Sequence, residues 1–366
     1  MSSGAGLTVL LMSGAWYEGN AYMSLLSDAL REQGVDVRTP GLPVAFPLTR
    51  ALLRNRDADV VQLDWLYDYY ATDDLSAAWL NDVASVARAV AFLLDLLVVS
   101  ALDVRVVRTV HNERSHDGAY PRTERVVTEC VFTVADAVTV KCEAAADRIA
   151  AAYRVPDADD LAVVPDGNYV GAYENEVTRA DARRDLGIDD ARFVFVFFGR
   201  VRPYKGVPEL IEAFASLELP DAELLIAGNP ASAASEARVR RLAASEPQVR
   251  TTLSFVPDDR IQYYLNAADV LVLPYRRILN SGSAYLGLSF GTPIVAPAIG
   301  CLPETVPPEN GLLYDPADDD GLSRALRRAY GSSDLDAVAR ANRRRARTRT
   351  WERTCERLLE VYADAE

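Results

Sequence analysis

Apolar and polar positions in the first half of the chain alternate between short hydrophobic runs and longer amphipathic stretches. Residues 7–12 are continuously apolar, which is typical of a strand buried on both faces. The other predicted strands are 35–38, 59–64, 104–110 and 137–140, and the predicted helices are 22–33, 76–100, 122–134 and 143–153. This alternation predicts a parallel, doubly wound sheet.

The alternation pauses in a polar segment, 168–190, and begins again with a very apolar strand at 192–198. Later strands are predicted at 222–227, 251–255, 269–273 and 293–296, and helices at 207–217, 232–245, 259–267, 283–290, 318–330 and 351–363. A chain of 366 residues is also long for one core. We therefore expect an α/β protein with Rossmann-like domains at 1–170 and 190–345, and a C-terminal helix, 346–366, that packs back on the first domain.

Acidic residues outnumber basic ones: 53 Asp and Glu stand against 39 Lys and Arg, giving a formal net charge of −14. Lys141 and Lys205 are the only lysines. Carboxylates bind water and cations well, and their mutual repulsion is screened when the Debye length falls to about 3 Å at 1 M salt. The composition predicts a halophilic, archaeal source, with an ordinary acidic surface of a high-GC mesophile as the alternative. It argues against a nucleic-acid partner, because no broad basic face is available.

The four cysteines form no CxxC pair, and the chain has two histidines, which argues against a structural zinc site. The N-terminus lacks the basic region of a secretion signal, so we expect a cytoplasmic protein. The apolar stretch 90–102 is interrupted by Asp95 and is too short to span a bilayer. It favours a helix packed on a sheet, with peripheral contact at the inner face of the cell membrane as the alternative.

Polar residues follow the predicted strands at the edge where ligands bind in parallel sheets. In the first half these are Gly14, Asn20, Asp64, Trp65, His111 and Asn112, with Glu113 and Asp117 close by. In the second half they are Arg200, Lys205, Gly228, Asn229, Ser281, Gly282 and Ser283. The dinucleotide fingerprint GxGxxG is absent after both first strands, which argues against a nicotinamide or flavin enzyme. We expect the two sets to converge on one cleft if the sheets face each other.

Arg200 and Lys205 lie in a glycine-flanked segment after the apolar strand 192–198. An arginine offers a fork for two oxygens, and a lysine offers a compact point charge. The Ser-Gly-Ser segment at 281–283 precedes a predicted helix, whose free N–H groups and dipole form an anion site. A surface lysine and a plain helix cap are the alternatives. Together the two segments predict a diphosphate site.

Several ordered motifs in the second half resemble one known family. They are Gly-Arg-Val-Arg-Pro-Tyr-Lys-Gly at 199–206, Ala-Asp-Val-Leu-Val-Leu-Pro at 268–274, Phe-Gly-Thr-Pro-Ile-Val-Ala at 290–296, Gly-Cys-Leu-Pro-Glu at 300–304 and Asn-Gly-Leu-Leu-Tyr at 310–314. These segments resemble the GT-B glycosyltransferases, in particular family 4 and its relatives of the group 1 type. The likeness is strong over 190–330 and weaker over 1–170.

The resemblance implies two facing Rossmann-like domains and a UDP- or GDP-sugar as co-substrate. It also implies that Arg200 and Lys205 bind the diphosphate, with no metal and no further cofactor. One motif departs from the family, which commonly has two glutamates separated by seven residues ahead of Gly-Thr-Pro. Ile278 and Leu286 stand at those places. The segment 281–283 is then a candidate to hold the donor phosphate or sugar, and both retaining and inverting stereochemistry stay open.

The N-terminal half is expected to carry the acceptor. The resemblance suggests a sugar-facing histidine at His111, which could also accept a proton, while a histidine that caps the strand end is the alternative. Glu113 and Asp117 are the other candidate bases, and Trp65 either stacks on a sugar or simply packs.

We therefore expect a hexose-type sugar to be transferred to a glycan or lipid-linked acceptor. A nucleotide-sugar epimerase and a non-catalytic binding homologue are the rival interpretations.

Overall fold

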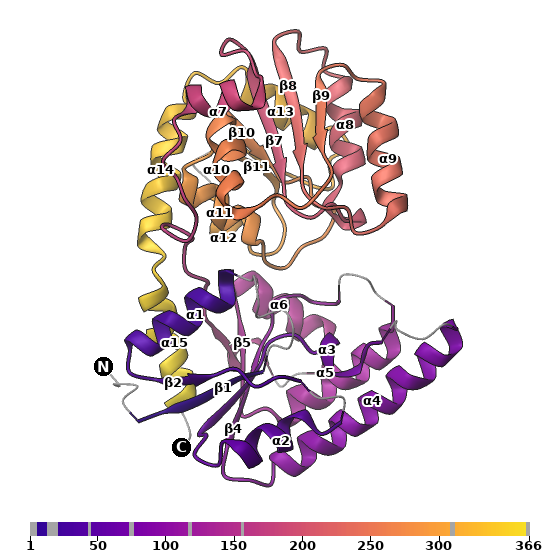
Figure 1. The fold of residues 1–366 in the computed structure, drawn as a ribbon, viewed down its shortest axis with the longest axis vertical. Helices are drawn as coiled ribbons and strands as arrows, with labels where there is room; N and C mark the ends of the chain where they lie inside the picture. The colour runs from indigo at the N-terminus through magenta and orange to yellow at the C-terminus, as the bar shows by residue number, and fades with distance from the viewer. Residues whose placement is uncertain are drawn as a thin grey trace. The chain divides into compact units, whose positions relative to one another are not determined.

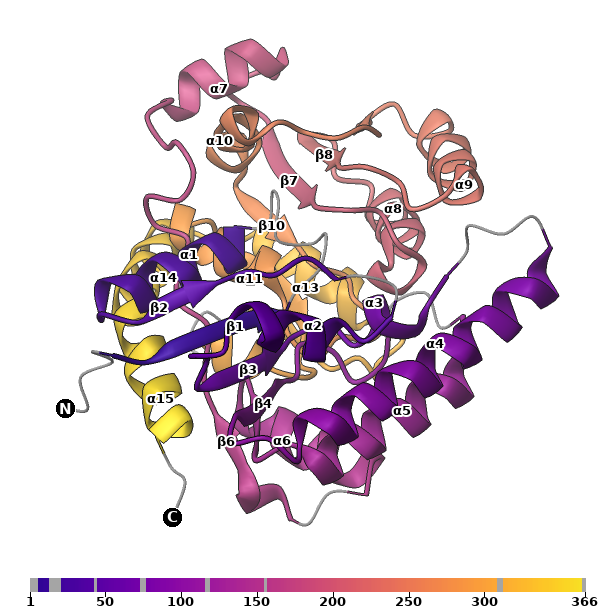
Figure 2. The same cartoon turned by 60° about the horizontal axis from the view of Figure 1, so that its bottom comes forward.

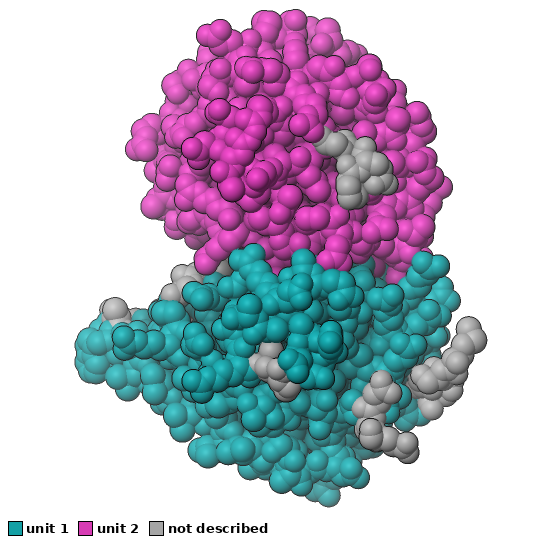
Figure 3. Space-filling view, turned by 180° about the vertical axis from the view of Figure 1, so that it is seen from behind, with its two compact units in different colours: residues 1–166, 351–366 teal, residues 167–350 magenta. Residues whose placement is uncertain are grey.

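The computed structural model describes residues 6–12, 21–42, 45–72, 77–115, 119–154, 157–307 and 312–363. The chain divides into two compact units, coloured separately in Figure 3. Unit 1 contains Met1–Asp166 and Trp351–Glu366, and unit 2 contains Gly167–Thr350. Each unit has a six-stranded sheet. All the strand pairs are parallel, which confirms the predicted α/β class with two Rossmann-like sheets.

The sheet of unit 1 has the order β2-β1-β3-β4-β5-β6. Its strands are β1 (Thr8–Met12), β2 (Asp36–Arg38), β3 (Val60–Leu63), β4 (Arg105–Thr109), β5 (Ala137–Val140) and β6 (Leu161–Val163). Every residue of β1 and β3 is buried, as expected of strands covered on both faces. The short strand β6 was not predicted, because its three residues give almost no periodic signal.

The helices of unit 1 build two separate apolar cores around this sheet. They are α1 (Ala21–Glu32), α2 (Pro47–Arg54), α3 (Tyr67–Tyr70), α4 (Ala78–Val99), α5 (Pro121–Val134), α6 (Glu143–Ala152), the 3₁₀ turn η2 (Ala158–Asp160) and α15 (Trp351–Ala363). One core contains buried side chains of α2, α4 and α5, and the other contains side chains of α1 and α15. Figure 1 shows α15 beside α1. The last helix is therefore part of unit 1.

The sheet of unit 2 has the order β12-β11-β10-β7-β8-β9. Its strands are β7 (Phe193–Phe198), β8 (Ala222–Ala227), β9 (Val249–Thr252), β10 (Val270–Val272), β11 (Ile294–Pro297) and β12 (Leu313–Tyr314). The helices are α7 (Arg179–Leu186), η3 (Pro203–Lys205), α8 (Val207–Ala215), α9 (Ala233–Ala244), α10 (Asp258–Ala267), α11 (Gly282–Phe290), α12 (Leu302–Thr305), α13 (Gly321–Tyr330) and α14 (Leu335–Thr348). Buried side chains from these elements form one continuous core.

The polar segment 168–190, expected as a linker, contains helix α7 and belongs to unit 2. Arg183 is buried there, because its guanidinium donates to a carboxylate oxygen of Asp269 at 2.8 Å and to three backbone carbonyls. Thr178 caps the helix by accepting from the N–H of Asp181. Polar side chains thus anchor α7, so hydrophobic periodicity alone could not reveal it.

Among the described residues, no helix combines the length and apolar character needed to cross a membrane.

Candidate functional site

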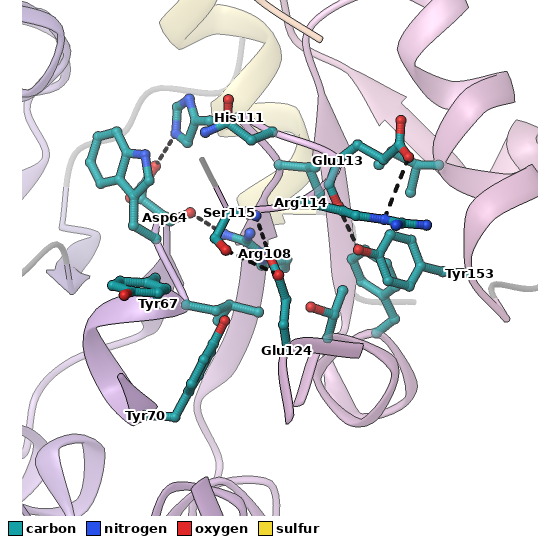
Figure 4. Close-up of a pocket in the computed structure, with 17 residues that line it drawn as sticks. Asp64, Tyr67, Tyr70, Arg108, His111, Glu113, Arg114, Ser115, Glu124 and Tyr153 are labelled. Carbon is teal, nitrogen blue, oxygen red and sulfur yellow. Dashed lines mark hydrogen bonds and ion pairs between the residues drawn. The ribbon is translucent and has the colours of Figure 1, made fainter. Parts of the chain in front are cut away.

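The carboxyl ends of β3 and β4 bring together residues that are far apart in the sequence. Asp64 and Trp65 follow β3, His111 lies two residues after β4, and the two strands are parallel neighbours. The Nε2 atom of His111 lies 2.9 Å from Oδ1 of Asp64, and the ring of Trp65 stacks on the imidazole at a centroid distance of 4.6 Å. Figure 4 shows the carboxylate of Asp64 turned toward the imidazole. His111 therefore interacts through its side chain rather than serving only as a strand cap.

A chain of buried hydrogen bonds holds the carboxylate of Asp64 in place. Gln62 and Asp64 point to the same side of the sheet because side chains alternate along a strand. The amide of Gln62 donates to both carboxylate oxygens, at 3.2 and 3.0 Å. The hydroxyl of Tyr362, in α15, donates in turn to Oε1 of Gln62. All four side chains of the series Tyr362–Gln62–Asp64–His111 are buried.

Burial and the hydrogen bond between Asp64 and His111 have opposite effects on the pKa of each residue. Burial lowers the pKa of His111 below its usual value, and this outweighs the hydrogen bond to Asp64. Burial alone would raise the pKa of Asp64, but the hydrogen bond with His111 and the nearby charges lower it overall. We assign a carboxylate at Asp64 and a neutral imidazole at His111 whose Nε2–H donates to it. The lone pair of the histidine is then on Nδ1.

A second buried charge pair adjoins the histidine. The ammonium of Lys141 lies 2.8 Å from Oδ1 of Asp166, and both residues are buried. Lys141 also lies 3.2 Å from the hydroxyl of Tyr22, whose ring meets the imidazole of His111 edge-on at 4.9 Å. In the sequence, Lys141 stands out only as one of the two lysines. Its position directly after β5 was the signal that could have placed it near the site.

A small pocket opens beside Asp64 and His111 (Figure 4). It is lined by Arg108 of β4, by the segments that follow β3 and β4, and by side chains of α3, α5 and α6. Its cavity volume is about 50 Å³, which suits water rather than a sugar ring. Burial lowers the pKa of Arg108, in its wall, to about 10. The guanidinium of Arg108 is held by the carbonyl oxygens of Leu63, Asp64 and Thr109. This pocket is therefore a structural element of the site rather than a substrate cavity.

The other acceptor-side candidates are distributed unevenly. Asn112 and Glu113 line the pocket, and the carboxylate of Glu113 is ion-paired with Arg148. The carboxylate of Glu113 thus already has a cationic partner in unit 1. Gly14, Asn20 and Asp117 lie outside the described residues.

In unit 2, two polar groups lie close to Gly199, the glycine that directly follows β7. Gly199 has a φ of +130°, and a Cβ there would lie 3.1 Å from Oγ of Ser283 and 3.2 Å from Nζ of Lys205. The ammonium of Lys205 also lies over the ring of Tyr275, 5.6 Å from its centroid. Arg200 follows Gly199 and is exposed. Within the described part of the chain, neither Arg200 nor Lys205 has a carboxylate partner, so both charges are open to an anion.

The segment 281–283 forms the N-terminus of α11. Oγ of Ser281 accepts from the N–H of Ala284 at 3.3 Å, and the hydroxyl of Ser283 donates to the carbonyl of Phe198 at 3.3 Å. Ser281 is thus a helix cap. A Cβ on Gly282 would make only an ordinary contact, 3.5 Å from the hydroxyl of Tyr169. The cap orients the first turn of α11 toward the end of β7, and donor binding by this turn stays a prediction.

The loop after β8 is packed against the loop after β7. A Cβ on Gly228 would lie 2.1 Å from the carbonyl oxygen of Gly199, so only glycine fits. The carbonyl of Asn229 accepts from the N–H of Val201 at 2.9 Å. Gly228 and Asn229 therefore shape the Gly199 loop, and a direct contact with a donor stays a prediction.

Ile278 and Leu286, which stand where the related family commonly has two glutamates, are buried in the apolar core of unit 2. No carboxylate replaces them at these positions. Among the described residues, no group of three His, Cys, Asp or Glu side chains is placed to bind a metal ion.

Part of the sequence is similar to proteins named as glycosyltransferases. The family model for "Glycosyl transferases group 1" matches residues 178–346. A D-inositol 3-phosphate glycosyltransferase of Saccharomonospora viridis is 31% identical over 69% of this chain and 61% of its own length. A GDP-mannose:glycolipid 4-beta-D-mannosyltransferase of Xanthomonas campestris is 30% identical over 46% of this chain and 48% of its own. The chain thus spans less than two thirds of either relative.

Solved structures share the fold across nearly the whole chain. Sucrose-phosphate synthase from Thermosynechococcus elongatus superposes with a TM-score of 0.77 at 18% identity, over 97% of this chain and 98% of the other. Anabaena HepE, in complex with UDP and glucose, superposes with a TM-score of 0.73 at 17% identity, over 98% and 100%. These likenesses confirm the GT-B fold. The match over residues 178–346 identifies this part of the chain as a domain of the group 1 glycosyltransferase family.

Proposed function

We propose that this protein transfers a hexose-type sugar from a nucleotide-diphosphate sugar to a glycan or lipid-linked acceptor. The observation that carries the proposal is the meeting of the Lys205 ammonium and the Ser283 hydroxyl over Gly199, at the N-terminus of α11. A lysine ammonium beside the N-terminal turn of a helix suits a diphosphate. UDP in the related Anabaena structure and GDP-mannose in the name of the Xanthomonas relative support a UDP- or GDP-linked donor.

The diphosphate gains negative charge as the bond from its oxygen to the sugar breaks. Arg200, Lys205 and the first turn of α11 are proposed to stabilise that charge. We propose that they do so without a metal ion and without a cofactor beyond the nucleotide sugar.

We further propose His111 as the base that accepts the proton of the acceptor hydroxyl. The hydroxyl oxygen forms the new bond to the anomeric carbon, the bond to the diphosphate breaks, and the proton moves to Nδ1 of His111. The carboxylate of Asp64, 2.9 Å from Nε2, stabilises the imidazolium that forms. A direct displacement of this kind inverts the anomeric configuration. An inverting displacement is compatible with this chain, in which Ile278 and Leu286 stand where the related family commonly has two glutamates.

The charge of the chain supports a proposal about its environment. A net charge of −14 with two lysines suits a halophilic, archaeal source and a cytoplasm rich in salt. We propose a cytoplasmic protein that works at the inner face of the cell membrane, where a lipid-linked acceptor would be presented.

A donor screen tests the function and separates its rivals. Thermal shift with UDP, GDP and their sugars should show stabilisation, because a ligand at 100 times its dissociation constant adds about 2.7 kcal/mol. Product analysis with the stabilising sugar then discriminates the outcomes. Transfer or slow donor hydrolysis supports the proposal, a free epimer indicates an epimerase, and binding without turnover indicates a binding homologue. Absence of any shift would contradict both the transferase and the epimerase, and would leave only a non-catalytic homologue that binds a glycan.

A further inference from the structure

Helix α4 carries two apolar stripes, and only one of them is used inside unit 1. The inward stripe, with Ala89, Phe92, Leu96 and Val99, is buried. The outward stripe recurs at three- and four-residue spacing, as one face of a helix requires. It consists of Trp79, Val83, Val86, Val90, Leu94 and Leu97, each more than half exposed, with Trp79 at 65% and Leu97 at 58%. A continuous apolar face of this length on a soluble unit indicates a binding surface.

The charges beside the stripe have the opposite sign to the protein as a whole. Helix α4 lies between α2 and α5, which both pack against it (Figures 1 and 2). Exposed arginines lie on both neighbours: Arg50 and Arg54 on α2, Arg122 and Arg125 on α5. The exposed or half-buried acids on these three helices are Asp82 and Glu129, and Glu129 is paired with Arg125 at 3.0 Å. Although the chain has a net charge of −14, the two helices that flank α4 thus carry a basic rim, which consists of Arg50, Arg54, Arg122 and the ion-paired Arg125.

We propose that this surface of α2, α4 and α5 docks on an anionic lipid bilayer. The apolar stripe would enter the boundary between headgroups and acyl chains, as the apolar face of an interfacial helix does. The arginines would meet lipid phosphates, each strengthening binding by about fivefold at moderate ionic strength. At molar salt this electrostatic contribution is screened and the apolar stripe sustains the contact.

A second copy of the chain fits the surface less well. Two α4 stripes packed face to face would bring α2 and α5 of one copy beside α2 or α5 of the other. Since both flanks carry arginines, either orientation places like charges together. An anionic bilayer instead has the charge opposite to that of the exposed arginines on both flanks.

The docking surface adds to the proposed function, because it would hold the site next to a lipid-linked acceptor. In that respect the inference rests on the proposed function. Binding to vesicles needs neither donor nor acceptor, so docking and transfer can fail independently.

Co-sedimentation of the full chain with vesicles tests the proposal. Vesicles of phosphatidylcholine alone and of an equimolar mixture with phosphatidylglycerol are compared, at low and at molar salt. We expect stronger binding to the anionic vesicles at low salt. The double variant Val90→Glu/Leu97→Glu should weaken binding at least about tenfold at both salt concentrations. The double variant Arg50→Glu/Arg122→Glu should weaken it only at low salt.

Matched controls lie outside the surface. Phe255 in unit 2 is 72% exposed, so Phe255→Glu introduces the same charge at an apolar surface position and should leave vesicle binding unchanged. Arg241→Glu is the control for the arginines, and melting temperatures of all variants verify their folding. Equal vesicle binding by Val90→Glu/Leu97→Glu and the parent chain would overturn the proposal. So would a lipid-independent dimer, seen by light scattering, that Leu97→Glu dissociates.

Discussion

Nε2 of His111 donates to Oδ1 of Asp64 at 2.9 Å, so the carboxylate determines which imidazole nitrogen carries the proton. The consequence is chemical as well as structural. With Nε2 protonated, Nδ1 has the lone pair that can accept a proton from a substrate. The sequence suggested His111 and Asp64 as separate candidates after separate strands. Because the two side chains are in direct contact, replacement of either one should disturb the function of the other.

Replacement of Asp64 tests this pair. Asp64→Asn places an amide N–H₂ where Gln62 donates to both carboxylate oxygens, so one donor must face another. We expect the turnover number to fall by about 10²-fold or more while donor affinity is retained, because proton acceptance in the transition state is lost. Steady-state rates and donor binding, measured on the same preparation, check this. The exposed Asp82→Asn is the control, and a fully active Asp64→Asn protein would remove Asp64 from the mechanism.

The cations of unit 2 are tested by truncation. Arg200→Ala or Lys205→Ala should lower the transfer rate by about 10²-fold or more with an unchanged fold, since neither side chain has a carboxylate partner among the described residues. Transfer assays and circular dichroism provide the comparison. Arg241→Ala, an exposed arginine of α9, should behave like the parent chain. Near-normal turnover in Lys205→Ala would show that this lysine is not part of the donor site.

The first turn of α11 is tested at its glycine. Gly282→Val should fold normally, because the nearest atom to a Cβ there is 3.5 Å away, but its branched side chain should block the approach of a phosphate to the backbone. We expect weaker donor binding in calorimetry. Gly41→Val, where a Cβ meets nothing within 4 Å, is the control. Unchanged donor affinity would indicate that the turn serves only as a cap.

The buried histidine predicts how stability depends on pH. The pKa of His111 is about 6.5 in an unfolded chain and is lowered by burial in the folded protein. Below that value the unfolded state binds a proton that the folded state does not, so stability is lost as pH falls from about 6.5 toward the folded-state pKa. The lowered pKa of Asp64 adds a further loss below about pH 4. Melting temperatures should decline over this range and decline less steeply near pH 6 in His111→Gln. An identical slope in both proteins would contradict the assignment of a neutral imidazole.

Salt dependence tests the proposed halophilic origin. If repulsion among surface carboxylates limits stability, the melting temperature should rise from about 0.1 M toward molar KCl as that repulsion is screened. Differential scanning calorimetry across this range provides the measurement. A flat or falling melting temperature would favour a mesophilic source with an ordinary acidic surface.

Much of the fold could be predicted because its strands are apolar and buried on both faces. Asp64, Trp65 and His111 could also be placed at one edge of the sheet of unit 1, because they follow β3 and β4, which are adjacent and parallel. It could not reveal what holds Asp64 in place. Gln62 lies inside a strand that reads as apolar, and its partner Tyr362 is 300 residues away along the chain. The role of a buried polar side chain such as Gln62 becomes clear only when its hydrogen-bond partners are known.

Helix α7 was missed for a related reason. Arg183 looks like a surface residue in the sequence, yet its guanidinium is buried because Asp269 and three carbonyls satisfy it. Hydrophobic periodicity detects elements anchored by apolar side chains and overlooks those anchored by polar ones.

The membership of α15 in unit 1 also governs the order in which the molecule can be assembled during synthesis. Cys355, Leu358 and Leu359 complete a core whose other members lie in β1, α1 and their neighbours. The ribosome translates all of Gly167–Thr350 before these side chains emerge. At about 5–20 residues per second, the apolar face of α1 waits on the order of ten seconds or more for its partner. The last residue of unit 2, Thr350, emerges directly before α15, so the first unit to begin synthesis is the last whose sequence is complete.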